Sequence, residues 1–340
     1  MVGMARRAGL MLGAIGTILA VLPAQANDSV RDLRSTQVLL EAPLFLSMAE
    51  VDAAFARVDA DRPQQKAPLP GGMAYWESTG VGYGQGDRVG RIGAGGSATQ
   101  MRIGFDRETR PGLIIGGMAS AGFGGVGSGD LGATVYGRHA DFYAKFSEGR
   151  VFAKALIGAS QFGFNAIDRG EAGSQCRADA SSVVARASGQ VGGHATLAGV
   201  TFTPTLTMTA LGDRLGGYSE RGGAARVSYG SRMAGAAIGA VRLAGSRSIR
   251  IDPKRNLKVE AFVGAEDVVG FAASGLKASA GGERIHTVSM GGSPTGRGLV
   301  GGLGVGTTLM EGVTVQFNHD YGRRDGYSTR TTRARLGVSF

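Results

Sequence analysis

Residues 198–210 read AGVTFTPTLTMTA, and their side chains alternate strictly between two kinds. One face carries Ala198, Val200, Phe202, Pro204, Leu206, Met208 and Ala210, while five threonines at 201, 203, 205, 207 and 209 occupy the other. A period of two is the pattern of a β-strand with two different faces. These 13 residues exceed the five or six of an average strand. A tilted transmembrane strand needs about 9–11 residues, so the stretch favours a strand that crosses a membrane.

The same alternation recurs after Gly72, and it predicts an all-β chain with twelve antiparallel strands. An even number returns both ends of the sheet to the same side of the membrane, as bacterial outer-membrane barrels require. The expected strands lie near 73–84, 95–106, 112–123, 129–146, 150–165, 179–191, 196–210, 222–244, 256–269, 284–305, 313–322 and 328–340.

Alternation alone does not separate a soluble sandwich from a membrane barrel, because both have one apolar and one polar face. The connections favour the barrel, since tight turns at 147–150 and 310–312 alternate with longer polar loops such as 166–178 and 270–296. Backbone groups in lipid must all be paired, so a membrane sheet has to close on itself. We therefore expect a closed, twelve-stranded transmembrane β-barrel over residues 72–340.

Composition narrows the class of protein further. Glycine contributes 60 of 340 residues, but hydrophobic residues make up 43%, which excludes a disordered tail. A single cysteine, Cys176, excludes an intrachain disulfide and a cysteine-rich metal site.

The net charge of +10 raises the question of nucleic acid, but the position of the arginines suggests another explanation. A charge on the lipid face costs about 2–4 kcal/mol near the midplane, so charged residues belong in the lumen. The residues expected there are Arg102, Arg186, Arg226, Arg232, Arg333 and Arg335. Two interpretations stay open: these arginines hydrate a channel, or they complement an acidic helix that carries Glu50, Asp52, Asp59 and Asp61.

The N-terminus has the layout of a secretory signal peptide. Arg6 and Arg7 precede an apolar run over 8–22, and the small residues Ala24 and Ala26 form a cleavage site. A membrane anchor is the alternative, but the run is short for a span of about 20 residues. We expect residues 1–26 to direct Sec-type export, after which the mature chain begins near Asn27 and does not meet nucleic acid.

Residues 27–71 read as a short helical segment followed by a linker. Apolar residues recur at steps of three and four between Val38 and Val58. Pro43 predicts a break near Ala42, with a second helix over 44–58. Extended to Arg62, residues 44–62 would span about 28 Å as a helix, close to the hydrocarbon thickness of about 30 Å, so we expect them in or near the lumen.

Patterns that would indicate an enzyme or a cofactor are weak. His139, His194, His286 and His319 lack metal-site spacing, and the glycine-rich stretch 84–96 is followed by a strand instead of a nucleotide-binding helix. Acidic loop residues leave open a catalytic outer rim; they are Asp168, Glu171, Asp213 and Glu220. We expect no enzyme activity, no catalytic residues, no cofactor and no metal.

Several short motifs follow one another from Gly72 onward. Trp76 opens the first strand, and after it come IGFDR at 103–107, PGLIIG at 111–116, VYG at 135–137, FTP at 202–204, GLGV at 302–305 and the closing hairpin at 312–321. In their order and spacing these stretches resemble the autotransporter (type V secretion) β-domain family. The resemblance implies a barrel in the outer membrane, a helix threading its lumen and a passenger segment outside. Residues 44–62 are similar in position to that helix.

The last strand resembles the outer-membrane assembly signal. Leu336, Val338 and Phe340 fit its alternating apolar pattern with a terminal aromatic residue, although Arg335 stands where the pattern has glycine. The resemblance implies delivery by periplasmic chaperones, insertion by the barrel-assembly machinery, and a monomeric barrel in contact with outer-membrane lipid.

Only about 45 residues separate Ala26 from Gly72, fewer than a large passenger requires. A minimal autotransporter, a barrel that lost its passenger and a barrel whose passenger is on another chain all remain open. We expect a translocator barrel that exports or anchors a very short N-terminal segment. The alternative is a passive or adhesive, porin-like surface barrel without a passenger.

Overall fold

The computed structural model describes residues 33–59, 72–86, 92–169, 176–222, 226–252, 255–288, 296–324 and 326–339. The predicted signal peptide, the linker, Asp61, Glu171 and the terminal Phe340 lie outside these described residues.

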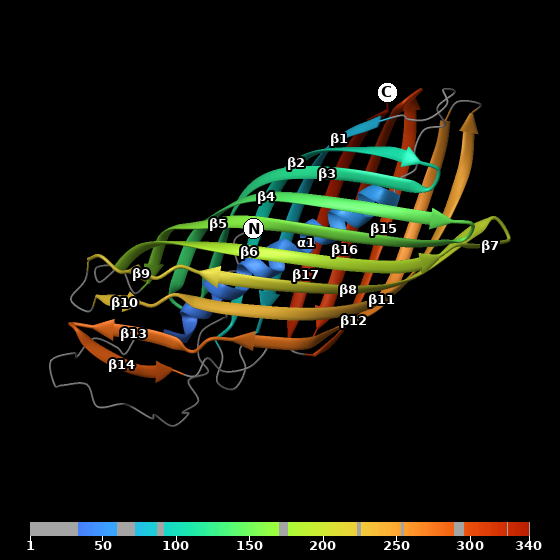
Figure 1. Cartoon of the computed structure of the whole chain (residues 1–340). Coiled ribbons are helices and arrows are strands. Elements are labelled where there is room, and N and C mark those ends of the chain that lie inside the picture. Colours follow the sequence, from blue (N-terminus) through green and yellow to red (C-terminus); the bar gives the residue numbers. More distant parts are fainter. Residues whose placement is uncertain are drawn as a thin grey trace, which may run out of the picture. The chain divides into compact units, whose positions relative to one another are not determined.

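Twelve antiparallel strands form one closed barrel, as predicted (Figure 1). Its wall consists of β1 (Gly72–Gln85), β2 (Ala94–Arg110), β3 (Leu113–Ser128), β4 (Leu131–Glu148), β5 (Val151–Arg169), β6 (Cys176–Gly193), β8 (Val200–Leu215), β11 (Arg232–Asp252), β12 (Arg255–Ala273), β15 (Arg297–Met310), β16 (Val313–Arg324) and β17 (Tyr327–Ser339). β1 pairs with β17, which closes the ring.

The strand register shows how strongly the strands are staggered. From Trp76, paired residues followed through β2 to β8 lead to Gly235 in β11. Followed the other way, through β17 to β12, they lead to Ile249, which is 14 residues further along the same strand. A stagger of this kind requires tilted strands, and tilt lets long strands fit a bilayer.

Two ends of the barrel differ in their connections. Tight turns at Gly112, Gly149 and Gly312, all with positive φ, lie at the end where β1 begins and β17 ends. We refer to this as the turn end and to the opposite end as the loop end. At the loop end a separate sheet is built from β9 (Tyr218–Ser219), β10 (Val227–Tyr229), β13 (Leu276–Ala280) and β14 (Glu283–Val288).

Three predicted boundaries were wrong. Ala198 and Gly199 form a turn with positive φ between β7 (Ala195–Leu197) and β8, so the strand begins at Val200. The predicted segments 222–244 and 284–305 each join a strand of the small sheet to a barrel strand, which begins at Arg232 or Arg297. The alternation of side chains with a period of two continues from one of these strands into the next. It does not indicate which neighbouring strand each segment pairs with, so it could not separate the small sheet from the barrel wall.

The two faces of the wall are as different as the sequence indicates. Large apolar side chains point outward, with Met101 70% and Leu303 68% exposed. The alternate residues point inward, and in β2 these include the buried Gln100 and Arg102. An apolar exterior with a polar interior is the arrangement of a transmembrane barrel.

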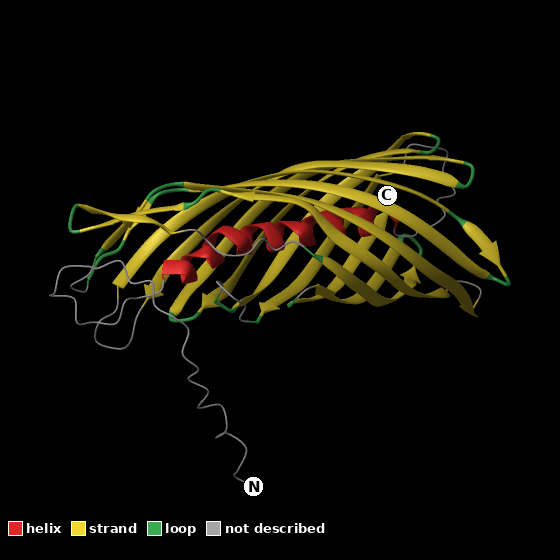
Figure 2. Ribbon diagram, turned by 90° about the horizontal axis from the view of Figure 1, so that it is seen from below, coloured by secondary structure: helices red, strands yellow, loops and turns green. Residues whose placement is uncertain are grey.

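One helix runs lengthwise inside the strands (Figure 2). A 3₁₀ turn, η1 (Leu33–Gln37), leads into α1 (Val38–Asp59). The predicted break near Ala42 is wrong, because α1 continues through Pro43. Proline removes one backbone hydrogen bond, but this residue lies in the second turn, where side chains buried against the wall hold the helix. Among the described residues, neither helix has the length and apolar character of a membrane-spanning helix.

Candidate functional site: the lumen and its helix

The helix α1 is enclosed by the barrel wall. Of its 22 residues, 17 are buried, and they are distributed around the whole helix instead of along one stripe. α1 contacts β1 to β6, β8 and β11. A helix that is buried all round is surrounded by protein, so α1 fills the lumen.

The half of α1 near the loop end is held by apolar contacts. Leu39, Leu40 and Leu46 are nearly inaccessible and belong to one cluster with wall residues. Wall side chains in this cluster include Val135, Phe162, Phe164, Val184, Leu211 and Leu215. Phe45 stacks on Tyr83 of β1, with ring centroids 5.2 Å apart. This half of the lumen is therefore packed like the core of a soluble protein, although the lumen of many such barrels is wet.

The half near the turn end is held by buried charges, with Glu50 at the centre. Its two carboxylate oxygens accept hydrogen bonds from Arg102 at 2.9 and 3.2 Å, and Ser120 donates a third at 3.1 Å. Arg102 also pairs with Glu77 of β1, and Glu77 in turn accepts a 2.7 Å hydrogen bond from Arg335 of β17. The chain of contacts joins the helix to β1, β2 and β17, the region where the barrel closes.

Further contacts fasten the last turns of the helix. Arg57 pairs with Asp106 at 2.6 Å, with both side chains buried. Arg335 donates to the backbone carbonyls of Ala53 and Ala56, both at 3.2 Å. Lys145 and Lys154 both pair with Asp59, the last residue of α1. Positive side chains at the C-terminal end of a helix also interact favourably with its dipole.

The structure places five of the six predicted arginines inside the barrel. Arg102 contacts the helix acid Glu50, and Arg232 donates to the backbone carbonyl of Thr36 at 2.6 Å. Arg186 pairs with Asp141 at 2.6 Å, and Arg333 pairs with Asp320, both within the wall. Arg335 contacts both the wall and the helix.

Arg226 does not belong to this group. It is exposed and directly precedes β10, in the small sheet at the loop end. The chain leaves the barrel wall between Leu215 and Arg232, so the alternation around Arg226 does not describe a lumen face.

Of the other predicted residues, Leu336 and Val338 lie in the outward-facing row of β17, and Leu336 is 39% exposed. Three of the acidic residues that were considered for a catalytic outer rim form local ion pairs or hydrogen bonds. Asp168 pairs with Arg177, Glu220 pairs with the buried Arg169, and Asp213 accepts from Ser182. Within the described part of the chain, His, Cys, Asp and Glu do not gather in threes that could hold a metal.

Sequence reasoning missed several residues that hold the helix. Lys154 was missed because β5 buries Phe152 and Leu156 on the same face and exposes Val151 and Ile157 on the other. Both faces of this strand are therefore apolar, and the period of two gives no inward direction. Sequence reasoning also missed five other charged residues in these contacts, which are Arg57, Glu77, Asp106, Lys145 and Arg242. Arg242 pairs with Asp52 of α1 at 3.1 Å.

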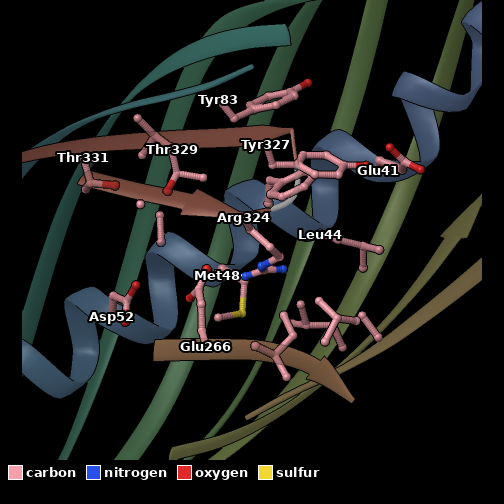
Figure 3. A pocket seen from close by; sticks show the side chains of 18 of the residues that line it. Glu41, Leu44, Met48, Asp52, Tyr83, Glu266, Arg324, Tyr327, Thr329 and Thr331 are labelled. Atoms are coloured by element: carbon pink, nitrogen blue, oxygen red, sulfur yellow. Dashed lines mark hydrogen bonds and ion pairs between the residues drawn. The ribbon is translucent and has the colours of Figure 1, made fainter. Parts of the chain in front are cut away.

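The helix does not fill the lumen evenly. A cavity of about 100 Å³ lies between α1 and strands β1, β8, β11, β12, β16 and β17 (Figure 3). Leu44 and Met48 of α1 line one side, Tyr83 and Tyr327 line another, and Arg324 pairs with Glu266 across the wall. This space is a gap along one side of the helix, and it is large enough to hold water.

Comparisons with known proteins agree with this architecture. The autotransporter beta-domain family matches residues 75–339. The translocator domain of the autotransporter NalP from Neisseria meningitidis has a similar fold, with a TM-score of 0.71 and 14% identity, covering 90% of this chain and 99% of that one. The beta domain of the Bordetella autotransporter BrkA gives a TM-score of 0.62 and 18% identity, covering 79% and 100%.

A search of curated proteins finds no match to the sequence. The matched family consists of translocator barrels, which are monomeric barrels of the outer membrane and not an enzyme family. Since that family covers most of the chain and the twelve strands and internal helix agree with it, this protein belongs to the autotransporter beta-domain family.

Proposed function

We propose that this translocator barrel exports or anchors a short N-terminal segment and that α1 then stays in the lumen and closes it. The observation that supports this most directly is the burial of α1 along its whole length inside the barrel. A segment that only passed through would not need matched contacts at both ends of the lumen.

The direction of the helix fits export of the residues before it. Thr36, at the start, contacts Arg232 at the loop end, whereas Asp59, at the end, contacts Lys145 and Lys154 near the turn end. Outer-membrane barrels have short turns on the periplasmic side and longer loops outside. The loop end is then extracellular, and a segment preceding α1 would leave the barrel there.

The contacts are strong enough for a permanent plug. Removing one partner of a buried ion pair costs about 3–5 kcal/mol, because the other charge is left without compensation. Glu50 and Arg57 each have such a buried partner, Arg102 and Asp106. The apolar half adds burial of the leucine side chains, each contributing about 1.5–3 kcal/mol. Together these contacts would retain the helix after export.

The remaining steps follow from the sequence. Residues 1–26 would direct Sec-type export to the periplasm, residues 27–71 would supply the exported segment, the plug and a linker, and residues 72–340 would form the barrel. Periplasmic chaperones and the assembly machinery would read Leu336, Val338 and Phe340 at the end of the chain. The luminal arginines, chiefly Arg102 and Arg335, would hold the plug.

The second candidate is a passive, porin-like barrel. The cavity beside α1 favours it in one respect, because the helix leaves one side of the lumen incompletely packed. Conductance of the intact protein would have to pass that gap, whose walls include the Arg324–Glu266 pair.

An epitope inserted after Asn27 tests the export direction. We expect antibody to label it on intact cells, because the segment before α1 would be outside. As the control, an epitope inserted at the turn of Gly149 should be labelled only after the outer membrane is permeabilised. Labelling of the first epitope only after permeabilisation would contradict the proposal and favour the porin-like barrel.

A further inference from the structure

Three arginines lie on the outer surface of three neighbouring strands near the loop end of the barrel. They are Arg297 of β15, Arg323 of β16 and Arg330 of β17, and all three are exposed. Each shares its strand face with outward apolar residues: Arg297 with Leu299, Arg323 with Tyr321, and Arg330 with Leu336. All three therefore point away from the lumen.

The register places Arg323 between the other two. Arg323 is paired with Leu299 of β15 on one side and with Ser328 of β17 on the other. Arg297 is two residues from Leu299, and Arg330 is two residues from Ser328. Diagonal neighbours of this kind are about 7–8 Å apart. The three arginines therefore form an oblique row with Arg323 in the middle, and their long side chains can reach different groups of one large bound molecule.

The charge of this cluster is only partly compensated. Arg297 contacts Asp267 at 3.4 Å but is 92% exposed on its side chain. Arg330 lies over the ring of Tyr321, 5.9 Å from its centroid. Among the described residues, no carboxylate lies within ion-pair distance of Arg323 or Arg330. Their inward-facing neighbours Arg324 and Arg333, in contrast, pair with Glu266 and Asp320.

The position of the cluster suggests what neutralises it. Leu299 and Leu303, 69% and 68% exposed, lie on the same face of β15 and form part of the lipid-facing surface. Arg297 lies beyond Leu299 toward the loop end, Arg323 is the register partner of Leu299, and Arg330 is the register partner of Tyr321. The cluster therefore lies beside the last apolar residues of the lipid-facing surface near the loop end. Guanidinium groups bind phosphate through paired hydrogen bonds, more specifically than a lysine does.

We propose that Arg297, Arg323 and Arg330 bind the phosphate groups of a glycolipid in the outer leaflet. Three cations spread over three strands fit a headgroup with two phosphates better than one with a single phosphate. The acyl chains would lie along Leu299 and Leu303, and Tyr321 would hold Arg330 at headgroup level. This site lies outside the lumen, and its place in the outer leaflet rests on the proposed extracellular position of the loop end.

Native mass spectrometry of the full-length folded protein, mixed with diphosphoryl lipid A in detergent, tests this site. We expect a bound lipid on the unmodified protein and its loss in the triple variant R297Q/R323Q/R330Q. The single variant R323Q should weaken binding about tenfold, which is the contribution of one charge-assisted hydrogen bond. Monophosphoryl lipid A should bind more weakly than the diphosphoryl form to the unmodified protein.

Arg138→Gln is the matched control, because Arg138 is also exposed on the outer face but its register neighbours, Ala121 and Gln161, are not arginines. This variant should bind lipid A as the unmodified protein does. Folding is checked by the mobility difference between unheated and boiled samples on a detergent gel. Unchanged binding by folded R323Q, or an equal loss in R138Q, would overturn the proposal.

Discussion

Glu50 of α1 and Arg102 of β2 are joined by two hydrogen bonds of 2.9 and 3.2 Å, and neither side chain is accessible to water. The helix and the wall are thus connected by a buried ion pair about halfway along the lumen. Arg102 also pairs with Glu77, so a change at Glu50 affects the helix without leaving the arginine wholly unpartnered.

Replacing Glu50 by Gln should loosen the plug. The variant keeps the shape of the side chain but removes its charge from a buried pair. Because Arg102 keeps Glu77 as a partner, we expect a loss of about 1.5–3 kcal/mol, the range for hydrogen bonds to a charged group. The free energy of unfolding can be followed in urea by the gel-mobility difference between folded and unfolded barrel. Asp52→Asn is the control, because the Asp52–Arg242 pair is partly exposed and should contribute only about 1 kcal/mol or less. Equal losses in the two variants would show that Glu50 has no special role.

Deleting residues 33–59 should open the pore. In planar bilayers the unmodified protein should conduct weakly, because the gap beside α1 is only about 100 Å³. The deletion variant should conduct more and prefer anions, since it exposes arginines such as Arg102, Arg186 and Arg335 on the lumen wall. Equal conductance of the two proteins would mean that α1 does not close the lumen and would favour the porin-like barrel.

Gly104→Val should disrupt the charged half of the lumen. A Cβ atom at this position would lie 2.3 Å from the ring of Tyr75, over which Arg57 is placed at 4.8 Å. Tyr75 would have to move, and the Arg57–Asp106 contact would move with it. We expect a lower midpoint of unfolding in urea.

Gly80→Val provides the matched control for that substitution. Gly80 is also in a barrel strand, but a Cβ atom there meets nothing within 4 Å. This variant should unfold like the unmodified protein. A similar loss in both variants would attribute the effect to the strand backbone and not to Tyr75.

Phe340→Ser should reduce insertion into the outer membrane and leave protein in the periplasm. The prediction is based on the alternating residues Leu336, Val338 and Phe340, which we propose as the signal for assembly into the outer membrane. Val151→Ser serves as the control, since Val151 is an outward residue next to a turn at the same end of the barrel. Normal amounts of the Phe340 variant in the outer membrane would show that assembly does not depend on this residue.

The strand pattern was readable from the sequence because it is a local property. In an extended backbone successive side chains point to opposite sides, so Phe202 and Thr203 necessarily face different environments. Where this local signal failed, the reason was also local: β5 carries apolar residues on both faces, and Pro43 was given more weight than the packing around it.

The sequence by itself therefore determined the class of the barrel, its twelve strands and the direction of most of its side chains. Only the tertiary structure decided how the lumen is filled, with an apolar half near the loop end and a charged half near the turn end. The contact between Arg335 and the carbonyl of Ala53 joins residues 282 positions apart. No periodicity encodes such a pair, because it depends on how far the staggered strands are displaced when the barrel closes around α1.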